Sequence, residues 1–167
     1  SSAASDVYKR QIVYFSVPNL PEATVFTWNA DGVGDWADES NWIFDAGYTV
    51  PEIRANTPNH TAIFSDVATG PTAAVTHADV TVNRVEFNKS NHSYFVSGAG
   101  SVNLAATTDA MMRNPSMLVQ GSHEFQVRVN LQNDATVDVS SEGMLTFNNS
   151  LDLAGHTLTK TGAGEIA

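Results

Sequence analysis

The feature that most constrains this chain is the alternation of apolar and polar residues within 125–165. In residues 125–131, and again in residues 135–139, every second side chain is apolar. A period of two puts neighbouring side chains on opposite faces of a β-strand, so each segment predicts a half-buried strand. Asn, Asp, Gly and Ser interrupt the pattern at short intervals, as is typical of tight turns. We therefore expect a stack of short strands around a shared core.

The composition favours an all-β fold and narrows the chemistry. Charged residues make up 16% of the chain, below the roughly 25% of an average soluble protein. The abundant Thr, Val, Asn, Ser and Gly favour strands and turns. The chain has no cysteine, which excludes disulfide bonds and thiolate metal sites. No apolar run reaches the ~20 residues of a transmembrane helix. Residues 105–113 are the one segment where we consider a short helix.

The formal net charge of −10, from 18 acidic and 8 basic residues, limits the partners of this chain. Nucleic acids need clustered Lys and Arg to neutralise their phosphates, and anionic membrane surfaces attract the same residues. We therefore expect neither as a partner. Acidic turns leave calcium open as a ligand, because calcium prefers carboxylate and other oxygen ligands. We expect no other cofactor.

The chain divides into three parts by local composition. Residues 1–11, SSAASDVYKRQ, resemble a peptide produced when sequencing-adapter DNA is translated, and we exclude this non-native tail from the fold. Residues 12–60 are interpreted as an N-terminal cap region, with a first strand at 12–17 and a polar loop at its end. Residues 61–167 are interpreted as the strand stack. We expect this stack to be truncated at the C-terminus and a signal peptide to be missing.

All three tryptophans, Trp28, Trp36 and Trp42, lie around one glycine-containing turn. Such rings could form an exposed platform for sugar stacking, with Trp36, beside the turn, the most exposed of the three. They could also cap the first turn of a strand stack, whose core and strand edge would otherwise be open to solvent. We favour the cap and keep the sugar platform as the alternative.

The same segment carries four carboxylates whose spacing does not match an EF-hand calcium loop. We interpret them as solvated turn residues, with calcium binding and a glycosidase pair as alternatives. Nothing in the sequence places two of them across a cleft, as glycoside hydrolysis requires. The five histidines form no metal-binding pair at helical spacing, and no nucleophile motif or phosphate loop occurs. We therefore expect no catalytic residue. The four acidic residues are Asp31, Asp35, Asp38 and Glu39.

Two stretches of the chain resemble a known family. The opening TWNADGVGDWADESNW (27–42) and the closing LDLAGHTLTKTGAGEI (151–166) are similar to the autotransporter-associated β-strand repeat proteins, also called passenger-associated transport repeat proteins. The repeat of that family reads Leu-x-Lys-x-Gly-x-Gly-x-Leu or similar. The matching positions in this chain are Leu158, Lys160, Gly162 and Gly164, with Ile166 in place of the last Leu.

The resemblance implies a right-handed parallel β-solenoid, export from a bacterial cell, and no catalytic residue. In such a fold the two glycines would permit a turn where successive coils approach closely. Leu158 would point into the core, and Lys160 would lie outside at a corner of the coil. An antiparallel β-sandwich gives the same period of two and stays open as the alternative architecture.

Three functional hypotheses follow from these patterns. The leading one is a non-enzymatic structural or adhesive segment of a large exported, autotransporter-like bacterial surface protein, with glycans or host and neighbouring cell surfaces as its partners. The second is a carbohydrate-binding β-sandwich that uses Trp36. The third is a β-helix enzyme that degrades polysaccharides. We expect an extracellular or cell-surface location and leave the oligomeric state open.

Overall fold

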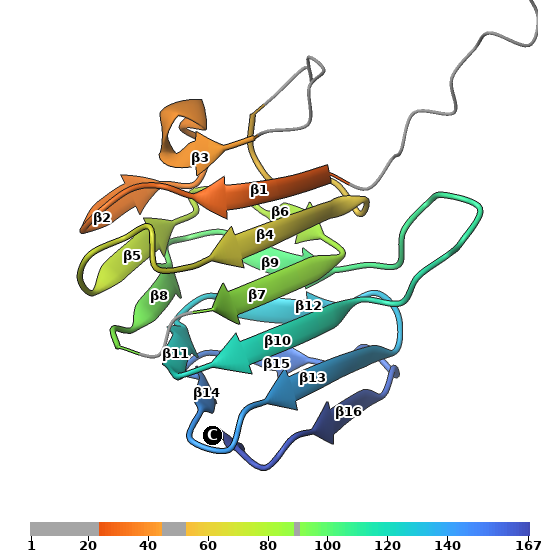
Figure 1. Ribbon diagram of the computed structural model, residues 1–167. Coiled ribbons are helices and arrows are strands. Elements are labelled where there is room, and N and C mark those ends of the chain that lie inside the picture. Colours follow the sequence, from red (N-terminus) through yellow and green to blue (C-terminus); the bar gives the residue numbers. More distant parts are fainter. Residues whose placement is uncertain (1–23, 45–52, 89–90) are drawn as a thin grey trace, which may run out of the picture.

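The computed structural model describes residues 24–44, 53–88 and 91–167 (Figure 1). These residues form short β-strands joined by tight corners, and they contain no α-helix. One 3-10 turn, η1 (Glu39–Asn41), follows the second strand. The adapter-like tail 1–11, the expected strand at 12–17 and part of the polar loop lie outside the described residues.

The strands belong to three sheets, which we name A, B and C. Sheet A contains, in spatial order, β16 (Leu158–Thr161), β13 (Ala135–Val139), β10 (Ser116–Gln120), β7 (Arg84–Asn88), β4 (His60–Phe64), β1 (Thr24–Trp28) and β3 (Trp42–Ile43). Sheet B contains β17 (Glu165–Ile166), β14 (Met144–Phe147), β11 (Ser122–Phe125), β8 (Tyr94–Ser97), β5 (Thr72–Val75) and β2 (Val33–Asp35). Sheet C contains β15 (Leu151–Asp152), β12 (Arg128–Leu131), β9 (Ser101–Leu104) and β6 (Val80–Val82).

From β4 onward the chain visits sheets A, B and C in turn and then begins again one layer further along (Figure 1). Each strand therefore pairs with the strand three places later, and all of these pairings are parallel. The single antiparallel pairing among the described residues joins β1 to β3. The antiparallel β-sandwich alternative is therefore wrong. The alternating segments 125–131 and 135–139 do not form a hairpin, because their strands pair in parallel with other layers.

The parallel stack begins earlier than the sequence division at residue 61 suggests. β1 pairs in parallel with β4 in sheet A, and β2 pairs in parallel with β5 in sheet B. The region 12–60 thus contributes two strands to the parallel layers of the stack, in addition to the antiparallel β3. Only β3 and η1, which follow β2, depart from the pattern of the later layers.

The register keeps like positions stacked from layer to layer. On the outer side of sheet A, Arg84 pairs with Ser116, which pairs with Thr136 in the next layer. On the inner side, Val85 pairs with Met117, which pairs with Val137. A shift of the strand register by one residue would point these apolar side chains toward solvent. Their burial therefore fixes the register.

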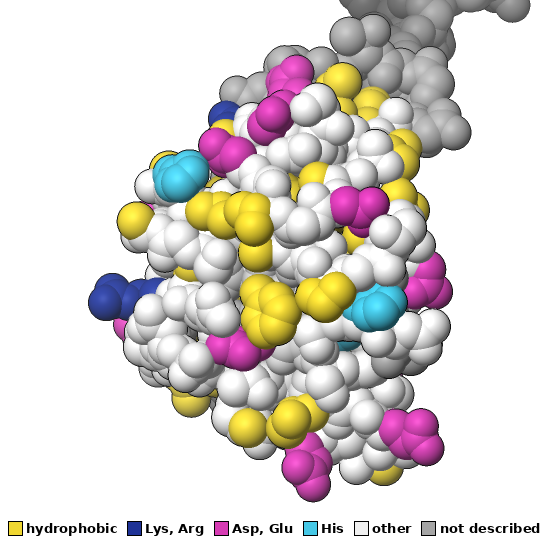
Figure 2. Space-filling model, turned by 90° about the vertical axis from the view of Figure 1, so that its left-hand side faces the viewer, with side chains coloured by type: hydrophobic (Ala, Val, Ile, Leu, Met, Phe, Trp, Pro, Cys, Tyr) yellow, Lys and Arg dark blue, Asp and Glu magenta, His cyan; other side chains and the backbone are white. Residues whose placement is uncertain are grey.

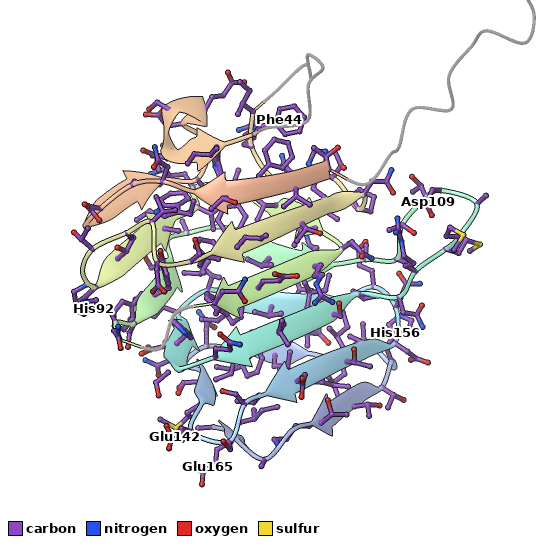
Figure 3. All side chains as sticks on the ribbon, viewed as in Figure 1. Phe44, His92, Asp109, Glu142, His156 and Glu165 are labelled. Carbon is purple, nitrogen blue, oxygen red and sulfur yellow. The ribbon has the colours of Figure 1, made fainter. Side chains whose placement is uncertain are left out.

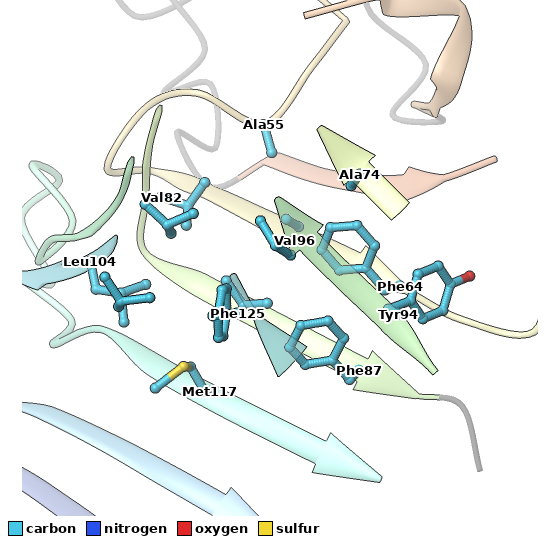
Figure 4. Close-up of a cluster of buried hydrophobic side chains, with 14 of the residues drawn as sticks. Ala55, Phe64, Ala74, Val82, Phe87, Tyr94, Val96, Leu104, Met117 and Phe125 are labelled. Atoms are coloured by element: carbon cyan, nitrogen blue, oxygen red, sulfur yellow. The ribbon is translucent and has the colours of Figure 1, made fainter. Parts of the chain in front are cut away.

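The core lies between the three sheets and is rich in aromatic rings (Figure 4). Phe64 stacks on Phe87 with ring centroids 5.3 Å apart, and Phe87 meets Phe125 edge to face at 5.7 Å. Phe125 then stacks on Phe147 at 5.6 Å. The rings therefore form a continuous series along the stack, and offset or edge-to-face pairs of this kind add to the stability from area burial alone.

The alternating segment 125–131 is divided by a corner. β11 ends at Phe125 and β12 begins at Arg128, yet Phe125, Val127 and Val129 are all buried. The chain turns from sheet B to sheet C without losing its inward and outward alternation. The pattern thus predicted which side chains are buried, but not that the chain changes sheet between them.

Residues 105–115 form a loop that projects from the stack between β9 and β10 (Figure 1), and they contain no helix. Asp109 holds the loop in shape: its Oδ1 accepts hydrogen bonds from the Thr107 hydroxyl at 2.8 Å and from the Met111 amide at 3.1 Å. Met112 adopts a positive φ of 44° at the tip. The short helix considered at 105–113 is therefore wrong, because an Asp-based turn competes with helical hydrogen bonding.

Candidate functional site

The three tryptophans lie inside the molecule, at the end of the stack formed by β1, β2 and β3. Trp28, Trp36 and Trp42 are 0%, 1% and 4% exposed. Trp42 lies 5.0 Å from each of the other two rings, measured between centroids, and all three contact Phe64. The expectation that Trp36 is exposed is wrong, and with it the sugar platform built on these rings.

Hydrogen bonds and one glycine explain why these large rings are buried. The Trp36 indole N–H donates to the carbonyl of Ala55 at 2.8 Å, and the Trp42 indole N–H donates to the carbonyl of Trp36 at 2.9 Å. A side chain at Gly34 would come within 2.7 Å of the Trp28 ring, so only glycine leaves that ring its space. The polar edge of each indole is thus satisfied without contact to solvent.

Each of the four carboxylates in this segment accepts a hydrogen bond from a different backbone amide. Asp31 accepts from the Thr69 amide at 2.6 Å, and Asp35 accepts from the Ala37 amide at 2.8 Å. Glu39 accepts from the Ile53 amide at 3.1 Å. These bonds support their interpretation as turn residues.

Asp38 is the N-cap of η1 and accepts from both the hydroxyl and the amide of Ser40. The Ser40 hydroxyl is the main reason that the pKa of Asp38 is lowered, because it stabilises the carboxylate. Among the described residues, no three His, Asp or Glu side chains come together as a metal site would require. Calcium binding stays a prediction for which no ligand set has been found.

The repeat-like residues lie in the last layer. Leu158 is partly buried against the core. Gly162 has a positive φ of 74°, and a side chain there would overlap the carbonyl oxygen of Val139 in the layer above. A side chain at Gly164 would overlap the carbonyl oxygen of Ser140 in the same way. The two glycines thus stand where successive layers approach closely, at the corner between sheets A and B.

Lys160 does not lie on the outer side of the stack as expected. Its strand position pairs with Val137, which is fully buried, so both side chains belong to the inner side of sheet A. The Lys160 ammonium is exposed at the end of the stack and donates to the carbonyl of Gly162 at 2.8 Å. The expectation failed because Leu158 and Lys160 are two residues apart and therefore share a face.

A groove lies on the outer face of sheet B, which Figure 2 shows face on, with hydrophobic side chains along its middle. The half-buried ring of Phe95, at the centre of β8, forms part of its floor. Two adjoining hollows of about 350 Å³ and 180 Å³ share Phe95, Ser93 and Ser122. We call this the Phe95 groove. Its other lining residues include Asn91, His92 and Glu142 on one side and Glu124, Met144 and Thr146 on the other.

The Phe95 groove combines an aromatic ring with hydroxyl groups and carboxylates. Glu124 pairs with Phe95 in the sheet register, and one of its oxygens accepts from the Asn148 amide group at 2.8 Å. His92 and Glu142 lie on the same edge of the molecule, whereas Asp109 lies on the projecting loop opposite (Figure 3). No Lys or Arg is among the described residues that line the groove.

Sequence reasoning missed Phe95, although a signal was present. In β8, Tyr94 and Val96 are fully buried, so the residue between them must face outward. A large aromatic side chain at an outward position is unusual and indicates either a contact or a site. Unlike the three tryptophans, Phe95 does not belong to a cluster of like residues in the sequence, so only its place between Tyr94 and Val96 marks its position.

A second groove, of about 330 Å³, lies along the outer face of sheet C. Asp79 accepts there from the amide and hydroxyl of Ser101 at 3.0 and 2.9 Å, and Asn130 donates to Asn103 at 2.8 Å. Arg128 supplies the positive charge of this groove. Its polar groups largely bind one another, and no aromatic ring is among its lining residues.

Comparison with protein-family models, with curated proteins and with solved structures finds no match to this chain. Within the part of the chain that the structure describes, no helix is long and apolar enough to cross a membrane.

Proposed function

We propose that this chain is a structural and adhesive segment of a large exported bacterial surface protein, and that it acts without catalysis. In this proposal the three sheets are the walls of a right-handed parallel β-solenoid, since parallel crossovers are almost always right-handed. Its mechanism is mechanical. Backbone pairing between layers and the buried aromatic series keep the stack rigid, and the outer faces are presented to other surfaces.

The observation that carries the proposal is the recurrence of sheets A, B and C in consecutive layers with a constant register. Such repetition gives a stack that can be extended layer by layer, because each layer contacts only its neighbours. The motif at Leu158, Gly162 and Gly164 adds support, since its glycines lie where layers approach closely. The proposed kinship with the autotransporter-associated β-strand repeat proteins depends on this motif and on the tryptophan-rich opening.

In the same proposal the tryptophan cluster is the cap of the stack. Trp28, Trp36 and Trp42 are buried beside β1, and β3 pairs antiparallel along the outer edge of that strand. β3 thereby covers part of the edge of β1, where backbone groups would otherwise be unpaired. Large rings fill the space that a further parallel layer would take.

The test of this proposal is the reading frame on both sides of the coding sequence. We expect a signal peptide upstream and, downstream, further layers with the Leu-x-Lys-x-Gly-x-Gly pattern, followed by an anchor or a translocation domain. A downstream hydrolase domain without further repeats would contradict the proposal. Labelling of intact source cells with antibodies against the purified chain checks the surface location independently.

A further inference from the structure

We propose that the Phe95 groove on sheet B binds a neutral saccharide. The inference rests on the adhesive role proposed above and names the class of partner that this face contacts. It assigns the contact to Phe95, on the outer face of β8, in place of the buried tryptophans.

The ring of Phe95 supplies the stacking surface. It is half-buried on an outward face, between Ala73 and Glu124 in the sheet register, so one part of the ring is held by neighbours and another part is accessible. The negative face of an aromatic ring attracts the C–H groups of a sugar ring, which carry partial positive charge. The parallel layers fix the position of the ring, so little conformational entropy is lost when a sugar binds.

The polar groups around the ring match a sugar with many hydroxyl groups. Ser93 and Ser122 line both hollows and can donate or accept hydrogen bonds. The Glu142 carboxylate has no hydrogen-bond partner among the described residues and can accept from sugar hydroxyls. The larger hollow, at about 350 Å³, falls at the lower end of the size range of small-molecule sites. A short saccharide segment fits these dimensions and this chemistry.

Charge decides between neutral and acidic saccharides. Glu124 and Glu142 line the groove, no Lys or Arg is found among its described lining residues, and the chain carries a net charge of −10. A uronate, sialic acid or sulfate group would meet these carboxylates, with no cationic partner among the lining residues that the structure describes. The groove on sheet C contains Arg128 but offers no ring. The Phe95 groove is therefore the one that suits a neutral sugar.

The experiment uses the purified full chain on an array of neutral hexose and N-acetylhexosamine oligosaccharides, with uronate- and sialic-acid-terminated glycans for comparison. We expect binding to neutral members, followed by titration calorimetry with the best one. Phe95→Ala should weaken binding about tenfold, because it removes the stacking contact. Phe95→Tyr should keep the affinity within about threefold of the unchanged chain, since the ring stays. Glu142→Gln should weaken binding by a smaller factor.

The matched control is Leu118→Ala, which removes a half-buried outward side chain from β10 on sheet A and should leave binding unchanged. Thermal melts of each variant show that it is folded. Absence of binding to any neutral glycan, binding restricted to acidic glycans, or equal affinity of the unchanged chain and Phe95→Ala would each overturn the inference. A negative array together with further layers in the reading frame would reject this site and leave the proposed function standing. A downstream hydrolase domain would reject the proposed function and leave a positive array result intact.

Discussion

Within this chain, the two ends of the stack cover the core in different ways. At the β1 end, Trp28, Trp36 and Trp42 are almost fully buried, and β3 covers the edge of sheet A. At the β16 end, Leu158 and Ile166 are only partly buried. The layers between them have the same three-sheet geometry. The backbone repeat is therefore uniform, whereas the stability of each end depends on the volume of its side chains and on what covers the edge.

This difference has an energetic consequence. A layered stack gains stability from each interface between neighbouring layers, so a terminal layer with one interface opens more easily than an internal one. The aromatic end offsets this disadvantage with large buried rings and three satisfied indole N–H groups. The β16 end has the partly buried Leu158 and Ile166 instead, and no aromatic ring in β16 or β17. We therefore expect unfolding to begin at the β16 end.

The largest effect is expected from Trp36→Ala. Removal of a fully buried ring from the aromatic end should lower the free energy of unfolding by about 3–5 kcal/mol. Ile166→Ala at the other end should cost about 1 kcal/mol or less, because that side chain is only partly buried. Urea denaturation followed by circular dichroism measures both. Equal losses of unfolding free energy for the two variants would contradict the expected difference between the ends.

Two glycines in similar surroundings, one in the middle of the stack and one in its last layer, provide a second test of the difference in stability. Neither Gly100 nor Gly164 has a positive φ, and a side chain at either would overlap a carbonyl oxygen of the layer above, that of Ala78 or Ser140. Gly100→Ala, in the middle of the stack, should cost about 1–3 kcal/mol, as overpacking of an interior usually does.

Gly164→Ala should have a smaller effect on global stability, because the last layer can move away without disturbing the others. Hydrogen-exchange mass spectrometry should show faster exchange confined to β16 and β17 in this variant. A loss of global stability as large as that of Gly100→Ala would show that the last layer is coupled to the rest more tightly than its packing indicates.

A further effect, which appears only at alkaline pH, involves Tyr94 in β8. Burial raises the pKa of Tyr94 to about 12, while its hydroxyl donates to the carbonyl of Ser65. The unfolded phenol ionises near its ordinary pKa of about 10. Above that pH the unfolded state loses its proton first, so the free energy of unfolding is unaffected below about pH 10 and falls between about pH 10 and 12.

Tyr94→Phe should remove most of this fall, and the difference between the two pH profiles isolates the contribution of this tyrosine. Parallel profiles from pH 9 to 12 would contradict the assignment of the alkaline transition to the buried phenol.

The sequence predicted the inner and outer sides of the strands better than it predicted how the strands pair. Phe125, Val127 and Val129 were expected to share a face, and all three are buried. A period of two is common to parallel and antiparallel sheets, so the pattern could not decide between a stack and a sandwich. The corner after Phe125 could not be recognised in the sequence, because the alternation of apolar and polar residues continues through it.

The candidate site was harder to predict, for reasons that differ between residues. Whether the tryptophans are buried depends on residues distant in sequence, such as Phe64 and the carbonyl of Ala55, which no local pattern reveals. The position of Lys160 and the outward direction of Phe95 both follow from a period of two, so both could have been predicted from the sequence. Lys160 was placed at a corner because the repeat-like motif was interpreted as a turn. The direction of Phe95 was not predicted.

The most direct test of the difference between the ends is native-state hydrogen exchange of the full chain, measured residue by residue. We predict that amides of β1, β4 and β7 exchange only through global unfolding, whereas those of β16 and β17 exchange through local opening with a lower free energy. Uniform protection along the stack, or stronger protection at β16 than at β1, would contradict it.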